Sequence, residues 1–500
     1  MSAAETLDDW RELAGGLDIR NKAFINGEFV DAASGETYTS INPADGSEIA
    51  AIASCDTEDV ERVVKAARDA FESGVWSQMA PARRKRTLQK FAQKMRDNRE
   101  ELALLESLDV GKPIRDTTRI DIPASAASID WFAELIDKVY DEIAPSDPAF
   151  LGMITREALG VVGIIVPWNF PLLMASWKLG PALASGNSVI LKPASVSSLT
   201  ALRVAELASE AGIPDGVFNV ITGSGSKVGM AMGLHMDIDG IGFTGSTEVG
   251  KQLMQYAGQS NLKRLGLELG GKTPNIVLAD SPDLDYAAKA ACFGIFFNQG
   301  EICNAGSRLL VQDSIKDEFM ELMTNAAGRH VPGEPLDPGT RMGAIVDKSQ
   351  MDKVLYYIGE GRSEGANLLY GGNQVREDTG GFYVEPTIFD KVSNDMKIAQ
   401  EEIFGPVLSV ITFKDVDEAI EIANDTIYGL ASAVWTSNLA TAHKTARAIK
   451  AGTVWINNYD QADMTVPFGG YKQSGFGRDK SIHALDKFTQ LKTTWINLAV

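Results

Sequence analysis

Residues 159–192 read LGVVGIIVPWNFPLLMASWKLGPALASGNSVILK. The apolar run at 160–168 is typical of a strand buried on both faces, residues 174–184 predict a helix, and SVILKP at 188–193 predicts another buried strand. Alternation of strands and helices with short glycine turns predicts an α/β fold with a parallel, doubly wound sheet. Further elements are expected at 199–211 (helix), VFNVITG (217–223, strand), IDGIGFTGS (238–246, strand leading into a helix that starts near Ser246) and LKRLGLELGG (262–271, strand).

A second alternating region runs from Asn275 to about Gly470 and predicts a second α/β domain. A chain of 500 residues suits two or three domains, so this division is consistent with its length. In this region we expect strands at 309–311, 407–413 and 453–457, and helices at 283–296 and 416–424.

The segments outside these two regions are less regular. Asn26-Gly27 lies between two apolar segments, as a tight hairpin turn requires. Residues 57–138 predict helices whose charges lie on the outer face, and we assign no chemistry to them. The last stretch, KFTQLKTTWINLAV (487–500), is β-prone, and it pairs with a sheet edge either of its own subunit or of a partner.

The composition excludes several classes of protein. Lys and Arg number 47 against 67 Asp and Glu, so the formal charge is −20, whereas nucleic-acid binding needs clustered positive charge. The acidic start MSAAETLDDW is not a secretory signal, and no apolar stretch approaches the roughly 20 residues of a membrane span. Three separated cysteines suit a reducing compartment, so we expect a cytoplasmic protein. Four scattered histidines, with no HExxH or CxxC pattern, predict no metal site.

Cys303 lies in FFNQGEICNAGSRLL (296–310), after a predicted break of the helix at Asn298-Gln299-Gly300. Small residues follow it, and they allow a substrate carbonyl to approach the thiol and leave backbone N–H groups free. A lone cysteine is more often a buried core residue than a nucleophile. Cys292, inside an apolar helix, fits that description, and Cys55 begins a polar turn without supporting context.

Two other segments favour a reactive Cys303. LELGGK (267–272) places Glu268 at the end of an apolar strand, where burial would raise its pKa toward the range of a general base. VPWNFP (166–171) holds Asn169 between two prolines, as a rigid amide donor suited to an oxyanion. The alternatives are an ion-paired glutamate and an ordinary polar turn.

Six blocks together resemble the NAD(P)-dependent aldehyde dehydrogenase superfamily, in order and spacing, from about residue 20 to the C-terminus. The resemblance implies that family's fold, with a Rossmann-like dinucleotide-binding domain (1–138 and 160–270), a catalytic domain (271–485) and an oligomerisation β-arm (139–159 and 486–500). It also implies a homodimer or homotetramer. The blocks are VPWNFPLLMASWKLGPALASGNSVILKP, FTGSTEVGK, LELGGKTPNIV, FFNQGEICNAGSR, EEIFGPVLSV and PFGGYKQSGFGRD.

The resemblance also implies a role for each matching residue. Cys303 is the nucleophile, Glu268 the base that hydrolyses the thioester, and Asn169, together with the Cys303 backbone N–H, holds the oxyanion. Lys192 is implied to be both a catalytic and a cofactor-binding residue, and it reaches the cofactor ribose. The other implied cofactor contacts are Val166, Pro167, Trp168, Ser195, Gly225, Gly229, Phe243, Gly245, Ser246, Val249, Leu269, Glu402 and Phe404.

Ser195 bears on the choice between NAD and NADP. Relatives that prefer NAD commonly carry Glu at this position, where a carboxylate binds the ribose hydroxyls and repels a 2′-phosphate. Ser195 removes that repulsion, and the KPAS run is similar to that of NADP-using succinate-semialdehyde dehydrogenases. We therefore expect NADP to be accepted as well as NAD, the alternative being a neutral serine without effect.

Over its whole length the chain most resembles bacterial ω-aminoaldehyde dehydrogenases of polyamine and arginine breakdown, of the γ-glutamyl-γ-aminobutyraldehyde and guanidinobutyraldehyde types. Glu301 or Asp460 is expected to attract a distal cation, unless both are solvated rim charges. The aspartate pair of plant aminoaldehyde enzymes is missing at 121–124, so betaine aldehyde is disfavoured. The candidate substrate contacts are Phe170, Met174, Trp177, Glu301, Ile302, Asp460 and Phe468.

Three other functions are weighed. A less selective enzyme for small aliphatic, hydroxylated or semialdehyde substrates remains open. A non-catalytic relative of this fold is disfavoured because Cys303 and Glu268 are both present. Acyl transfer to coenzyme A is disfavoured because relatives of that kind usually lack the hydrolytic glutamate.

Overall fold

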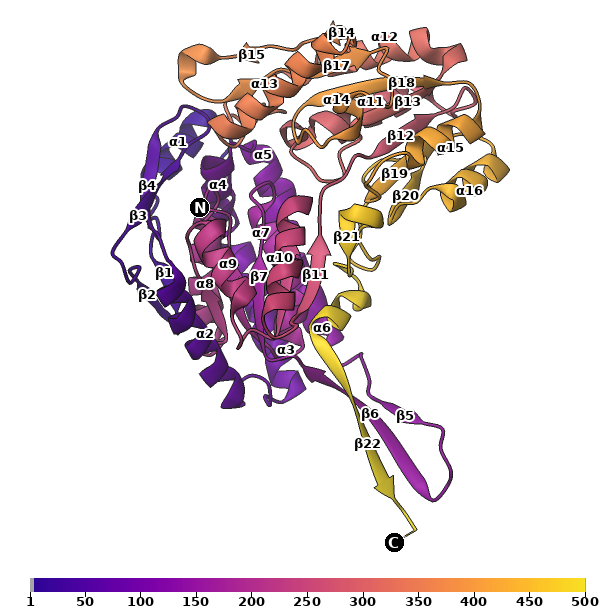
Figure 1. Cartoon of the computed structure of the whole chain (residues 1–500). Coiled ribbons are helices and arrows are strands. Elements are labelled where there is room, and N and C mark those ends of the chain that lie inside the picture. Colours follow the sequence, from indigo (N-terminus) through magenta and orange to yellow (C-terminus); the bar gives the residue numbers. More distant parts are fainter. Residues whose placement is uncertain (1–3, 500) are drawn as a thin grey trace.

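The computed structural model describes residues 4–499 and contains two large sheets with helices packed on them (Figure 1). The first sheet has eight strands in the order β2-β1-β9-β8-β7-β10-β11-β21. Its central strands β7 to β11 run parallel, as the sequence predicts. The strands are β1 (Ala23–Ile25), β2 (Glu28–Val30), β7 (Val161–Ile165), β8 (Ser188–Lys192), β9 (Phe218–Val220), β10 (Gly240–Thr244), β11 (Arg264–Glu268) and β21 (Gly475–Phe476).

Strand β7 is buried on both faces, which confirms the reading of its apolar run. Val162 and Ile164 belong to the core beneath the helices α6, α7 and α8, whereas Val161 and Ile165 pack into a second cluster with α2 and α10. A strand covered by helices on both sides needs apolar residues at every position. The helices are α2 (Thr57–Glu72), α6 (Ile122–Leu135), α7 (Pro171–Ala184), α8 (Leu199–Ala211), α9 (Met230–Leu234) and α10 (Thr247–Gln259).

Two predicted turns take the expected form. Asn26 and Gly27 both have positive φ, 53° and 83°, so they make the hairpin turn that joins β1 to β2. Ser246 caps α10, because its hydroxyl accepts a hydrogen bond from the backbone N–H of Val249.

The second sheet has seven strands in the order β14-β17-β18-β13-β12-β19-β20, and all its pairs are parallel except β14–β17. After this domain, the chain returns to the first sheet through β21, which pairs with β11. The strands are β12 (Pro274–Val277), β13 (Arg308–Gln312), β14 (Asn367–Tyr370), β17 (Thr387–Asp390), β18 (Val407–Phe413), β19 (Ala431–Trp435) and β20 (Thr453–Ile456), with helices α11 (Leu284–Phe296), α12 (Lys316–Ala327), α13 (Lys348–Ser363), α14 (Lys397–Gln400), α15 (Val416–Asn424) and α16 (Leu439–Ala448).

The prediction that charges of the region 57–138 lie on its outer face is wrong for several side chains, among them Asp59. Glu106, Asp109 and Lys112 are fully or almost fully buried. They are tolerated because they have partners: Glu106 accepts from the N–H of Leu172 in α7, and Asp109 accepts from the N–H of Leu199 in α8. Lys112 forms a buried ion pair with Asp121. The additional helices of this region are α3 (Pro81–Asp97), α4 (Arg99–Val110), α5 (Ile114–Asp116) and the π-helical turn Thr117–Asp121.

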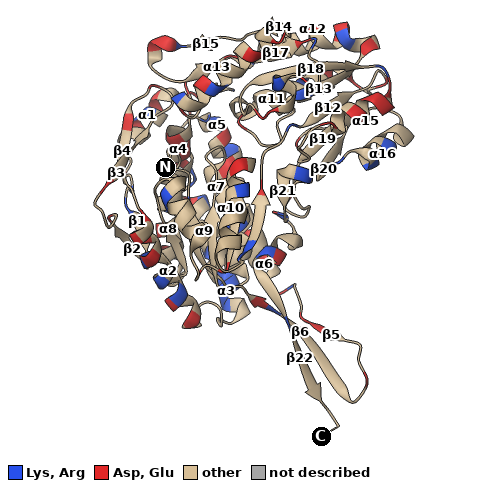
Figure 2. Ribbon diagram, viewed as in Figure 1, with Lys and Arg blue, Asp and Glu red and all other residues tan. Residues whose placement is uncertain are grey.

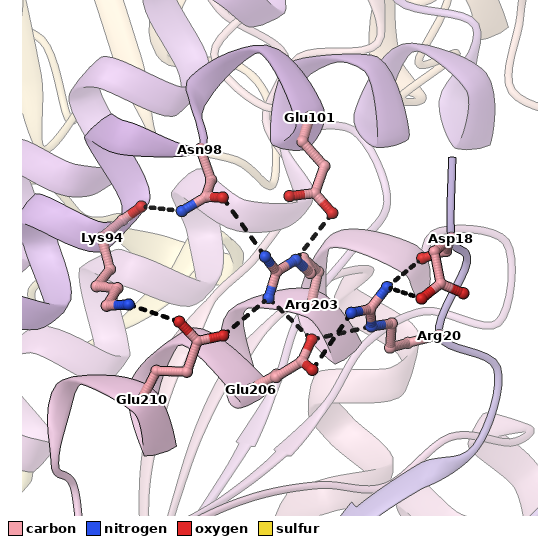
Figure 3. Close-up of polar contacts among 8 residues, drawn as sticks. All are labelled: Asp18, Arg20, Lys94, Asn98, Glu101, Arg203, Glu206 and Glu210. Carbon is pink, nitrogen blue, oxygen red and sulfur yellow. Dashed lines mark hydrogen bonds and ion pairs between the residues drawn. The ribbon is translucent and has the colours of Figure 1, made fainter. Parts of the chain in front are cut away.

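The N-terminal segment is tied to this domain by a network of ion pairs (Figure 3). Arg203 on α8 forms ion pairs with Glu101, Glu206 and Glu210. Arg20, in the N-terminal segment, forms an ion pair with the same Glu206. Acidic and basic residues are interspersed over the covering helices (Figure 2). Within residues 4–499, no helix is both long and apolar enough to cross a membrane. The remaining N-terminal elements are α1 (Leu7–Gly15), β3 (Thr37–Ile41) and β4 (Glu48–Ala53), and a two-stranded sheet is formed by β15 (Gln374–Val375) and β16 (Tyr383–Val384).

The C-terminal strand pairs with an edge of its own chain, which is one of the two alternatives that the sequence leaves open. β22 (Thr489–Asn497) runs antiparallel to β6 (Phe150–Ala158), and β6 pairs in turn with β5 (Glu142–Ala144). This three-stranded sheet projects from the body of the molecule (Figure 1). Within the described chain, the other edge of β22 has no partner strand.

Candidate active site

A cavity of about 1060 Å³ lies where the two domains face each other. Its wall combines residues at the carboxyl ends of β7, β10 and β11 with residues from α6, α7, α11 and the loop 460–468. Ligands of open α/β sheets bind at such strand ends. The wall brings together these sequence-predicted residues: Pro167, Trp168, Asn169, Phe170, Met174, Trp177, Gly245, Ser246, Leu269, Ile302, Cys303, Glu402, Phe404, Asp460 and Phe468.

Cys303 reaches the cavity because the chain reverses after α11. Asn298, Gln299 and Gly300 all have positive φ, at 47°, 56° and 71°, so they form the break that the sequence predicts. Burial raises the pKa of the Cys303 thiol, and the nearby carboxylates of Glu402 and Glu268 raise it further. Of the three cysteines only Cys303 is partly exposed, and the reading of Cys292 as a core thiol is confirmed.

Asn169 lies in the turn between β7 and α7 and is 5% exposed. Its side-chain Nδ2 donates to the carbonyl oxygen of Glu301 at 2.8 Å, and Asn298 Nδ2 donates to the carbonyl oxygen of Asn169 at 3.1 Å. An amide nitrogen carries two hydrogens, so the second can serve a ligand. These bonds fix the Asn169 amide beside the segment that carries Cys303.

Glu268 ends β11 and is 4% exposed. Neither of its carboxylate oxygens has a hydrogen-bond partner among residues 4–499. Burial raises its pKa well above the ordinary value, as the strand-end position predicts; Asp479 raises it further, whereas Lys487 and Lys178 oppose the rise. A Cβ built on Gly469 would lie 2.8 Å from Glu268 Oε1, so the carboxyl group points toward that glycine rather than forming part of the cavity wall.

The glycines that follow Glu268 hold a second carboxylate. The backbone N–H of Gly271 donates to Glu402 Oε1 at 2.9 Å, and a Cβ on Gly270 would lie 2.3 Å from Glu402 Oε2. Burial raises the pKa of Glu402 to about 7. Beside it the rings of Trp168 and Phe404 meet edge to face, with centroids 5.2 Å apart.

The other predicted cofactor contacts lie outside this cavity, on the parallel strands β7 to β10 or in the loops and helices that follow them. Lys192 is the last residue of β8, and its ammonium donates to the carbonyl oxygen of Pro193 at 2.9 Å. Burial lowers the pKa of Lys192 to about 8. Strand ends of this kind accept a dinucleotide. The remaining residues of this group are Val166, Ser195, Gly225, Gly229, Phe243 and Val249.

The expectation that Glu301 lines the substrate tunnel is wrong. Glu301 is 1% exposed, does not belong to the cavity wall, and accepts from the backbone N–H of Val346 at 3.1 Å. The left-handed turn before it directs Ile302 and Cys303, but not Glu301, into the cavity. Asp460 does lie in the wall, where its Oδ1 accepts from Asn304 Nδ2 at 2.8 Å and burial raises its pKa.

Several wall residues were not singled out from the sequence. Phe293 and Phe297 stack with centroids 4.9 Å apart, and Phe297 lies 6.3 Å from the ring of Phe170. Phe297 stands in FFNQG shortly before Cys303, and Phe293 lies one helical turn earlier in α11, which is a signal that could have found them. Asn304 follows Cys303 directly, but Lys480 stands in no pattern that points to a cavity.

A strand-end cleft, a cavity cysteine and a buried carboxylate are the features of a dinucleotide-dependent α/β enzyme. The model of the aldehyde dehydrogenase family matches residues 29–494. The NADP/NAD-dependent aldehyde dehydrogenase PuuC of Escherichia coli K12 is 54% identical over 489 residues, which cover 98% of each chain. The chain belongs to the aldehyde dehydrogenase family and is an NAD(P)-dependent aldehyde dehydrogenase.

Two solved structures have the same fold. The indole-3-acetaldehyde dehydrogenase AldA of P. syringae, solved with NAD+, is 60% identical with a TM-score of 0.98, and the match covers 99% of this chain and 100% of that one. A γ-glutamyl-γ-aminobutyraldehyde dehydrogenase of Burkholderia cenocepacia J2315 is 59% identical with a TM-score of 0.97 and the same coverage. The predicted family and fold are thereby confirmed.

Proposed function

We propose that this enzyme oxidises ω-aminoaldehydes to the corresponding acids. The observation that carries this is the carboxylate of Asp460 in the wall of a cavity that is otherwise rich in aromatic rings. The ring centroids of Trp177 and Phe468 lie 5.5 Å apart in that wall, and the ring faces can contact an alkyl chain or a cation. The candidate substrates are 4-aminobutyraldehyde, 4-guanidinobutyraldehyde and γ-glutamyl-γ-aminobutyraldehyde, which would place the enzyme in polyamine or arginine breakdown. The name of the Burkholderia relative supports this choice.

In the proposed mechanism Cys303 loses its thiol proton to solvent, and its thiolate adds to the aldehyde carbon to form a thiohemiacetal with a negative oxygen. The Asn169 amide and the Cys303 backbone N–H stabilise the negative oxygen of that adduct. Loss of a hydride from the same carbon leaves a thioester on Cys303. Replacement of Cys303 by Ala should abolish dehydrogenation, and normal aldehyde oxidation by that variant would contradict the mechanism.

Glu268 then accepts a proton from the water that attacks the thioester carbonyl, and the acid leaves as the thiol is restored. NAD(P)+, when bound, supplies the hydride acceptor. The residues present fit this cofactor: Glu402 beside the Gly270-Gly271 turn suits the nicotinamide ribose, and the N-terminus of α10 at Ser246 suits the pyrophosphate. Lys192 would serve the adenosine ribose, since the one partner of its buried ammonium within residues 4–499 is the backbone carbonyl of Pro193.

A less selective dehydrogenase of small aliphatic, hydroxylated or semialdehyde substrates is the second candidate. The aromatic wall formed by Phe170, Phe293, Phe297 and Trp455 favours it, because such rings bind apolar chains without selecting charge. The name of the P. syringae relative, which refers to an aromatic aldehyde, points in the same direction.

The two candidates are separated by measuring kcat/KM for 4-aminobutyraldehyde, 4-guanidinobutyraldehyde and pentanal in the wild type and in Asp460→Asn. An ω-aminoaldehyde enzyme has a higher kcat/KM for the cationic substrates than for pentanal. In Asp460→Asn this ratio should fall about tenfold, which corresponds to the free energy of one hydrogen bond to a charged group. Asp417→Asn, an exposed aspartate that pairs with Lys444, is the control and should retain the wild-type preference. Equal kcat/KM for charged and neutral aldehydes in the wild type would favour the second candidate.

The assembly and the compartment are also proposed. Residues 1–138 and 160–270 form the dinucleotide-binding domain, 271–485 the catalytic domain, and 139–159 with 486–500 the oligomerisation arm of a homodimer or homotetramer. Support comes from the unpaired edge of β22 and from exposed apolar side chains on the arm. The three unpaired cysteines support a reducing compartment such as the cytoplasm.

A further inference from the structure

Among the described residues, the wall of the aldehyde cavity holds two lysines, Lys353 and Lys480, and the proposed mechanism uses neither; Lys480 is the one beside Trp177. Only 3% of the residue is exposed, yet it belongs to the cavity wall. Its ammonium lies 5.3 Å from the centroid of the Trp177 ring. A lysine whose stem is buried and whose ammonium faces a cavity can bind an anionic group of a ligand there.

The backbone holds Lys480 in place from both sides. Asp479, before it, exchanges two hydrogen bonds of 2.8 Å with Phe468, and the N–H of Ser481, after it, donates to the carbonyl oxygen of Met464 at 2.8 Å. Lys480 itself adopts a left-handed conformation, with φ at 60°, which a non-glycine residue rarely adopts. The loop 464–468 lines the cavity, so this arrangement presents the Lys480 side chain to the same space.

Within residues 4–499 no hydrogen bond or ion pair reaches the Lys480 ammonium, which lies near the face of the Trp177 ring. Two carboxylates share its wall without pairing with it: Asp460, whose Oδ1 is bonded to Asn304, and Asp463, whose Oδ1 accepts from Thr465. The cavity therefore presents a positive and a negative group side by side, each with capacity left for a ligand. Burial lowers the pKa of Lys480, whereas Asp460 and Asp463 oppose that shift.

We propose that Lys480 is a specificity-determining residue that binds a carboxylate at the far end of the aldehyde, and that Asp463 and Asp460 bind an ammonium beside it. The ligand class is an aldehyde that ends in an α-amino acid group. A lysine paired with a substrate carboxylate and an aspartate paired with its ammonium would bind both charges of that group. This inference rests on the proposed function for the position of the aldehyde carbon at Cys303.

The test uses two matched pairs of aldehydes on the full-length enzyme: 5-oxopentanoate against pentanal, and γ-glutamyl-γ-aminobutyraldehyde against N-acetyl-4-aminobutyraldehyde. The quantity is the ratio of kcat/KM within each pair, measured for the wild type, Lys480→Met and Lys480→Arg. We expect Lys480→Met to lower both ratios about tenfold through KM, and Lys480→Arg to keep most of the preference, since it keeps the charge. Because each ratio is internal to a variant, a general loss of activity does not affect it.

Lys444→Met, an exposed lysine on α16, is the matched control and should leave both ratios at the wild-type value. If Lys480 only packs against Trp177, Lys480→Met lowers the melting temperature while both ratios stay unchanged, and the inference fails. The inference also fails if the wild type does not prefer the carboxylate member of either pair. Failure of the proposed function is distinguishable, because it would appear as a lack of preference for 4-aminobutyraldehyde over pentanal whatever residue stands at 480.

Discussion

Gly271 packs directly against the backbone of Cys303: a Cβ built on Gly271 would lie 2.3 Å from the carbonyl oxygen of Cys303. The same Gly271 donates its N–H to Glu402. One glycine thus joins the strand end that carries Glu268 to the loop that carries the cysteine. Close approach of two backbones is possible only where a side chain is missing.

Gly271→Ala should displace the Cys303 loop. We expect kcat/KM for any aldehyde to fall about 100-fold, because a misplacement of about 1 Å at the reacting atom costs a factor of that size. Gly359→Ala is the control, since a Cβ there meets nothing within 4 Å. Wild-type kcat/KM in Gly271→Ala would show that the loop tolerates the shift.

Glu268→Gln should separate acylation from hydrolysis. The first turnover still releases one equivalent of NAD(P)H, whereas kcat falls by about 10²- to 10⁴-fold, the usual contribution of a general base. Burial raises the pKa of Glu268, so a larger fraction of the enzyme carries the deprotonated base as the pH rises. We therefore expect kcat of the wild type to increase with pH. Stopped-flow absorbance at several pH values measures both. In Glu268→Gln the rise should be absent, while Glu321→Gln, on the exposed face of α12, should retain it.

Cys303 should be the one cysteine that alkylates in the folded enzyme. Burial raises the pKa of its thiol, so the rate of iodoacetamide labelling without cofactor should increase steadily from pH 7 to 9.5. Cys55 and Cys292 are both 0% exposed, and burial raises their pKa values to about 11 and about 12. Peptide mass spectrometry reads out each site. Equal labelling rates at pH 7 and pH 9, or early labelling of Cys292, would contradict this account.

Ser195→Glu should shift the cofactor preference toward NAD. Ser195 follows β8 closely, and a carboxylate there would repel a 2′-phosphate while accepting from ribose hydroxyls. We expect kcat/KM with NADP to fall at least tenfold and that with NAD to fall less. Ser363→Glu adds the same charge at an exposed site on α13 and serves as the control. An unchanged ratio of the two cofactors in Ser195→Glu would reduce Ser195 to a neutral surface residue.

The arm strands should be needed for assembly. Leu491 and Trp495 on β22 are 59% and 61% exposed, although such side chains are normally covered. Replacing both by Asp should shift the enzyme to smaller species in size-exclusion chromatography with light scattering. Leu439→Asp removes a leucine that is 73% exposed outside the arm, and it should leave the mass unchanged. An assembly that survives both arm substitutions would place the interface elsewhere.

The sequence alone determined the features that depend on neighbouring residues. The apolar run of β7, the turn at Asn26-Gly27, the cap at Ser246 and the break before Cys303 each follow from periodicity or turn chemistry within a few positions. Similarity along almost the whole sequence then identified the family, because the family's motifs occur in this chain in the same order.

Only the tertiary structure decided which charged side chains face the cavity. Glu301 and Asp460 are both acidic residues near aromatic ones, yet the turn before Glu301 directs it to the N–H of Val346, whereas Asp460 faces the cavity. Lys480 lies in the wall because backbone hydrogen bonds join its neighbours to a loop more than ten positions away. Glu106 is buried at the N-terminus of α7, where it accepts a hydrogen bond from a backbone N–H of that helix. The direction of a side chain depends on the elements that pack around it, and this information is not local to the chain.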